Sequence, residues 1–151
     1  MRGRGALVLA AGVVLVACGS PYPGRTLGDQ VRSWASTTGW SGSLATLRAD
    51  ARHVRTLETG HDPRALRTAC DALVDDALSA NQELPAPDGA LTAILSGAYA
   101  SAAAAGRDCL AGAGGRAALL ARAGHELDQA GSGYVKAQAR MDDLSSPGAA
   151  S

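Results

Sequence analysis

Apolar residues recur at alternating intervals of three and four along most of the chain, with polar residues between them. This spacing places the apolar side chains on one face of an α-helix. The longest unbroken example, in residues 116–144, comprises Leu120, Ala123, Leu127, Ala130, Tyr134, Ala137, Met141 and Leu144. Runs with the period of two that is typical of a half-buried strand are absent from the sequence. The pattern therefore predicts an all-α protein.

Local capping and breaking residues set the ends of the first two predicted helices. Thr26 is followed three residues later by Asp29, the spacing of a capping box, and the short helix that they start ends at Gly39. Ser43 is predicted to cap a second, longer helix, whose apolar stripe ends before Gly60.

Proline and glycine separate the remaining predicted helices. Asp62 is predicted to cap a third helix with Pro63 in its first position, where the missing N–H costs nothing. The two prolines of segment 83–87 force an extended passage, after which Asp88 starts a fourth helix. The glycines of segment 112–115 end that helix, and the fifth follows.

Four long helices joined by short links favour antiparallel neighbours. The sequence therefore predicts an antiparallel up-down helical bundle over residues 26–144, with the short first helix packed on it and a disordered tail at 145–151. The composition agrees, because the chain has no Phe and is rich in alanine. Such residues suit thin, closely packed helices.

The first residues of the chain have the features of an export signal. Arg2 and Arg4 precede an apolar stretch, residues 6–16, which has the length of a secretory signal and is too short to span a membrane. The segment 15–18 (Leu-Val-Ala-Cys) resembles the bacterial lipobox. The resemblance implies that a signal peptide, residues 1–17, is removed and that Cys18 becomes a lipidated N-terminus. The alternative is an ordinary signal peptide followed by an ordinary cysteine.

Residues 18–25 follow as a predicted tether, because their prolines and glycines disfavour regular structure. The seven residues after Cys18 extend at most about 23 Å, which would keep the bundle close to the lipid bilayer. The lipobox and the alanine-rich helices make the chain similar to small helical lipoproteins of actinobacteria. This likeness implies a lipid anchor on the extracytoplasmic face of the cell membrane, and it implies no binding residues.

Two cysteines remain when Cys18 is assigned to lipid. An oxidising compartment favours a disulfide between Cys70 and Cys109. Their distances from the predicted helix ends differ by about eight residues, or roughly 12 Å in height. The extended passage at 83–88 carries the chain about 15 Å, which brings the two cysteines level. The sequence thus predicts a disulfide-pinned bundle.

The charged residues show no pattern of a catalytic or metal site. With 14 basic and 14 acidic residues, the chain lacks the excess positive charge of a nucleic-acid-binding protein. Asp50 and His53 have the spacing of one carboxylate–histidine pair of a di-metal bundle, but a second pair is missing. We therefore expect His53, His61 and His125 on the surface, Asp75–Asp76 on a solvated face, and no catalytic residue, metal ligand or cofactor.

The aromatic residues near the tether have two possible roles. Trp34 and Trp40, with Tyr22 nearby, either hold the first helix on the bundle or contact lipid headgroups or a partner protein. Tyr99 and Tyr134 are expected in the bundle core with their hydroxyl groups at its edge.

The interpretation of the sequence is a non-enzymatic, membrane-anchored extracytoplasmic lipoprotein that presents its bundle to a protein partner in the cell envelope. The alternative is a bundle that binds a small ligand or a metal in its interior. An envelope enzyme is a third reading, and no nucleophile motif supports it.

Overall fold

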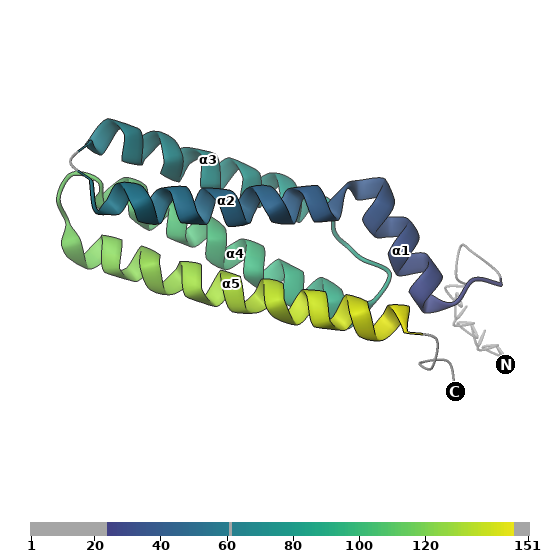
Figure 1. Ribbon diagram of the computed structural model, residues 1–151. Helices are drawn as coiled ribbons and strands as arrows, with labels where there is room; N and C mark the ends of the chain where they lie inside the picture. The colour runs from purple at the N-terminus through teal and green to yellow at the C-terminus, as the bar shows by residue number, and fades with distance from the viewer. Residues whose placement is uncertain (1–23, 61, 147–151) are drawn as a thin grey trace, which may run out of the picture.

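The computed structural model describes residues 24–60 and 62–146, and these residues form five helices and no strand (Figure 1). The helices are α1 (Leu27–Thr38), α2 (Trp40–Glu58), α3 (Pro63–Gln82), α4 (Gly89–Gly112) and α5 (Ala117–Ser145). The prediction of an all-α fold is confirmed. The predicted signal peptide, Cys18, the tether as far as Pro23, His61 and the tail from residue 147 lie outside the described residues.

Side-chain caps explain where three of the helices begin. The Thr26 hydroxyl accepts a hydrogen bond from the Asp29 backbone N–H, and the Asp29 carboxylate accepts one from the Thr26 backbone N–H. The Asp62 carboxylate accepts hydrogen bonds from two backbone N–H groups in the first turn of α3. Asp88 accepts one from the Leu91 N–H at the start of α4, at 2.7 Å. The predicted caps of these helices are confirmed.

The predicted cap of α2 is wrong. The helix begins at Trp40, directly after Gly39, whose φ of 72° allows the chain to leave α1 and enter α2 with one residue between them. Ser43 therefore lies inside the first turns of α2, and its hydroxyl donates to the Glu83 carboxylate at 2.8 Å instead. Positive φ at Gly39, and not a hydroxyl cap, sets this boundary.

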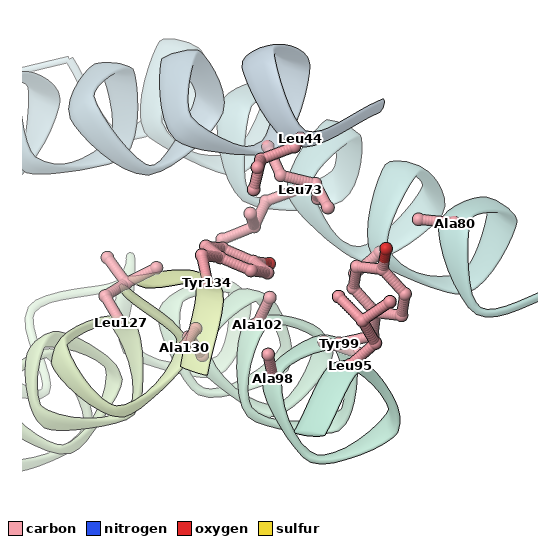
Figure 2. Packing of buried hydrophobic residues seen from close by; sticks show 14 of the residues in the cluster. Leu44, Leu73, Ala80, Leu95, Ala98, Tyr99, Ala102, Leu127, Ala130 and Tyr134 are labelled. Atoms are coloured by element: carbon pink, nitrogen blue, oxygen red, sulfur yellow. The ribbon is translucent and has the colours of Figure 1, made fainter. Parts of the chain in front are cut away.

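The core is made of small and medium-sized side chains around two tyrosine rings. Tyr99 and Tyr134 are 1% and 3% exposed, and their ring centroids are 6.1 Å apart. Figure 2 shows both rings among leucine and alanine side chains that come from α2, α3, α4 and α5. In an alanine-rich interior, these two rings supply much of the volume that fills the centre of the bundle.

Glycines let α4 approach its neighbours closely. A Cβ on Gly133 of α5 would lie 2.7 Å from the Ala98 Cβ of α4. A Cβ on Gly106 of α4 would lie 2.9 Å from the Cys70 carbonyl oxygen of α3. Any larger residue at either position would push the helices apart. The α4–α5 and α3–α4 contacts are the most extensive in the protein.

Ion pairs join α4 to α5 near both ends of the two helices. Asp88, at the start of α4, is paired with Arg140 near the end of α5, and Asp108 near the end of α4 is paired with Arg122 near the start of α5. Figure 1 shows the four long helices side by side, with α1 at an angle at one end.

The disulfide joins α3 to α4 inside the core. Cys70 and Cys109 are both fully buried, and their Cα atoms are 5.8 Å apart. The predicted pairing is therefore present. Closing a loop of 39 residues stabilises the fold by about 3 to 4 kcal/mol in the chain-entropy account of disulfides.

Among the described residues, α4 alone is long and apolar enough to cross a membrane by length and composition. It lies between α3 and α5, and 44% of its most apolar window is buried against them. A helix in the core of a bundle meets the same criteria, and α4 packs against both α3 and α5.

Candidate functional site

The predicted disulfide is a structural element, and the predicted lipidation site, Cys18, lies outside the described residues. Of the histidines, His53 and His125 are exposed, and a His125 ring nitrogen lies 3.0 Å from the Gln129 side-chain nitrogen. In the described part of the chain, no three His, Cys, Asp or Glu side chains come together to hold a metal ion.

Two carboxyl groups do meet between α2 and α3. Burial, together with the neighbouring Asp76 carboxyl, raises the pKa of Asp50 to about 6. One oxygen of Asp50 is buried without a hydrogen-bond partner in the described structure. Asp76 was expected on a solvated face with Asp75, but Asp75 is exposed while Asp76 is half-buried beside Asp50. Adjacent residues on a helix point in different directions, and only one of them faces α2.

Both tryptophans contact the bundle. The Trp34 indole N–H donates to the Glu83 backbone carbonyl at 3.0 Å, which ties α1 to the end of α3. Trp40 is 3% exposed. The Trp34 hydrogen bond agrees with the first of the two alternatives, in which the aromatic residues hold α1 on the bundle, whereas Trp40 is the first residue of α2 and is buried in the core.

The tyrosine hydroxyl groups are not at the edge of the core. Those of Tyr99 and Tyr134 are both buried without a hydrogen-bond partner among the described residues. Burial raises the pKa of Tyr99 to about 12 and raises that of Tyr134 as well. The expected position was wrong, because the rings lie in the centre of the bundle among leucine and alanine side chains and do not point out of it.

The most site-like feature is a groove between α2 and α5, with a volume of about 650 Å³. Its lining residues are Ala45, Leu47, Arg48, Ala51, Arg52, Arg55, Leu73, Ala102, Leu127, Asp128, Ala130, Gly131 and Tyr134. The leucines and the tyrosine are buried and form an apolar floor, while the charged residues are exposed. We refer to this feature as the α2–α5 groove.

Three arginines follow one rim of the groove. Arg48, Arg52 and Arg55 are spaced by four and three residues, so they share one face of α2. Arg55 pairs with Asp128 across the groove at 2.6 Å. Within residues 24–60 and 62–146, no carboxylate forms an ion pair with Arg48 or Arg52. The groove therefore combines an apolar floor with two arginines that lack a carboxylate partner.

A second hollow, of about 780 Å³, lies where the α2–α3 turn meets the α4–α5 link. Leu57, Leu66 and Leu120 line it, with Arg64 and Arg67 at its side. Gly60 and Asp62 also line it, and His61 lies outside the described residues.

Sequence reasoning missed the α2–α5 groove. The available signal was the arginine spacing on α2 together with small residues at Ala45, Ala51, Ala130 and Gly131, positions that flank the apolar stripes. Small residues at these positions can leave an open space between two helices, but they can equally allow the two helices to pack closely. Only the placement of α2 relative to α5 distinguishes the two.

No protein-family model matches this chain, and no curated protein and no solved structure matches it. Its function must therefore be inferred from its own residues.

Proposed function

We propose that the protein is an extracytoplasmic lipoprotein, anchored through Cys18 to the outer face of the cell membrane. The observation that carries the proposal is the buried Cys70–Cys109 disulfide, because such bonds persist in oxidising compartments. The order of basic residues, apolar stretch and lipobox in residues 1–18 supports it from the sequence. With two cysteines bonded to each other, Cys18 is the remaining thiol for a lipid.

We further infer that the four long helices form an antiparallel up-down bundle and that residues 26–144 are one domain. The ion pairs between opposite ends of α4 and α5 support the antiparallel order, as does the hydrogen bond from Ser43 in α2 to Glu83 after α3. The proposed role is non-catalytic: the bundle presents a surface to a protein partner in the envelope.

The anchor is tested by the intact mass of the protein purified from its native membrane, with and without reductant. The proposal expects a chain that begins at Cys18, carries a diacylglyceryl mass, and gains two alkylatable thiols only after reduction. A Cys18→Ser variant is the control and should lack the lipid mass. An unlipidated wild-type chain would contradict the anchor, and thiols that are free before reduction would contradict the disulfide.

A second candidate function is the binding of a small ligand by the bundle. The α2–α5 groove favours it, because pockets of about 300–1,000 Å³ with an apolar lining and a few charged groups are typical ligand sites. Thermal unfolding of the protein with candidate ligands tests this function, since a ligand that binds the folded state raises the melting temperature.

A further inference from the structure

We propose that the α2–α5 groove binds a single-chain anionic amphiphile, with its apolar chain on the groove floor and its carboxylate on the arginines of α2. The proposal rests on the second candidate function, ligand binding, and does not depend on the lipid anchor at Cys18. It commits to one chemical class, a fatty acid.

The floor of the groove has the shape and chemistry for an apolar chain. Leu47, Leu73 and Leu127 are buried and close the base of the groove, and the more exposed Ala45, Ala51 and Gly131 form the accessible apolar part of its walls. From Ala45 to Arg55 the α2 wall is ten residues long, or roughly 15 Å at the rise of an α-helix. A wall of this length beside an apolar base can accommodate an extended hydrocarbon chain.

The groove exists because small residues line its walls. Ala45 and Ala51 on α2 face Ala130 and Gly131 on α5, and none of them reaches across the space. A Cβ placed on Gly131 would meet no atom within 4 Å outside its own helix turn. Two residues later, a Cβ on Gly133 would be 2.7 Å from that of Ala98. The same helix is therefore tightly packed toward α4 and open toward α2.

The charges around the groove select an anion. Arg48 and Arg52 lie on one rim, where the Arg52 Nε–H donates to the Arg48 backbone carbonyl, and the carboxylate on the opposite rim, Asp128, is already paired with Arg55. Asp50, on the same helix, neighbours Asp76 of α3 rather than the groove. A guanidinium group holds a carboxylate with two parallel hydrogen bonds, and the attraction is stronger beside an apolar surface.

The test uses the full-length protein in native membrane vesicles and a pair of photoreactive probes. One probe is a twelve-carbon fatty acid with a diazirine in its chain, and the other is the alcohol of the same chain. After irradiation, labelled peptides are mapped by mass spectrometry. The proposal expects labels from the acid in 45–55 and 127–134, and about tenfold weaker labelling there by the alcohol, as expected for loss of a charged hydrogen bond.

Two leucine substitutions on α5 form a matched pair. Gly131→Leu fills the groove and should reduce labelling by the acid at least tenfold, while Gly124→Leu has open space around it but lies outside the groove and should leave labelling unchanged. Both replace a glycine within a helix, so both should keep or increase stability. The double variant Arg48→Gln with Arg52→Gln should bring labelling by the acid down to that by the alcohol.

The outcomes separate the hypotheses. Equal labelling of the groove by acid and alcohol would overturn the anionic specificity and leave ligand binding in place. Groove labelling that is absent, or that Gly131→Leu does not change, would overturn both the fatty acid and the ligand site. The intact mass of the same samples reports the Cys18 lipid independently, so failure of the anchor is distinguished from failure of the groove.

Discussion

The two sides of α5 differ sharply. Toward α4, Gly133 lies against Ala98 so closely that a Cβ would not fit, and ion pairs join both ends of the two helices. Toward α2, Gly131 faces open space, and one ion pair of the described residues, Arg55–Asp128, crosses the gap. Both sides are built from small residues. Whether a small residue produces close packing or a groove depends on whether the partner helix can approach.

On the closed side of α5 lies α4, which the disulfide also joins to α3. Replacing both cysteines, by Cys70→Ala with Cys109→Ala, should lower the free energy of unfolding by about 3 to 4 kcal/mol, because the unfolded chain regains the freedom of a 39-residue loop. Urea unfolding monitored by circular dichroism measures this loss. The reduced wild-type protein should show a similar loss, and a reduced protein as stable as the oxidised one would contradict the prediction.

The comparison between the two faces of α5 can be tested with one substitution made at two positions. Gly133→Leu should destabilise the protein by about 1 to 3 kcal/mol, because it forces α4 and α5 apart. Gly131→Leu should stabilise it by about 0.5 to 1 kcal/mol, because it removes a helix-interior glycine without a clash. Melting temperatures of the two variants give the sign of each effect. Changes of the same sign would show that the two sides of α5 do not differ in packing.

Protonation of Asp50 should tighten the contact between α2 and α3. Its pKa is raised from 3.8 to about 6, so the folded protein holds this proton more strongly than the unfolded chain. The Asp50 contribution to the free energy of unfolding is therefore largest near pH 4, falls as the pH rises through 6, and is unfavourable at pH 7. Asp50→Asn should stabilise the protein at pH 7 by about 1 kcal/mol, a value reduced for the solvent access of this group.

Melting temperatures between pH 4 and pH 7 test the Asp50 prediction. The difference between the Asp50→Asn variant and the wild type should grow with pH over this range. Asp75→Asn, at an exposed position next to Asp76, is the control and should change the profile little. A difference that is constant with pH would contradict the assigned role of Asp50.

The smallest effect is expected at the ion pair that crosses the groove. Arg55→Gln removes the partner of Asp128, but both groups are exposed, so the melting temperature should hardly change. Labelling by the photoreactive fatty acid should fall less than in the Arg48 and Arg52 double variant, because Arg55 is already occupied by Asp128. A marked loss of stability would show that this pair, and not the leucine floor, holds α2 near α5.

Local signals were sufficient to predict most of the fold. The caps at Thr26, Asp62 and Asp88 and the three-four spacing depend on neighbouring residues, and the helices follow them closely. The cysteine pairing was also predictable, because the extended segment 83–88 corrects the register between α3 and α4.

Features that depend on packing between distant segments were not predictable. Ser43 has the chemistry of a cap, but α2 begins after Gly39, four residues earlier. The hydroxyl groups of Tyr99 and Tyr134 are buried because the rings lie in the centre of the bundle among leucine and alanine side chains. The α2–α5 groove has no local signature, because alanine and glycine occur on both the closed and the open side of α5.

The position of α1 has a mechanical consequence. A pull on the N-terminal segment reaches the bundle through α1, which meets two different helices. Gly28 lies so close to the Leu144 carbonyl of α5 that a Cβ would not fit there, and the Trp34 indole is bonded to the Glu83 carbonyl after α3. We therefore expect tension at the N-terminus to load α5 and the end of α3 before it reaches α2.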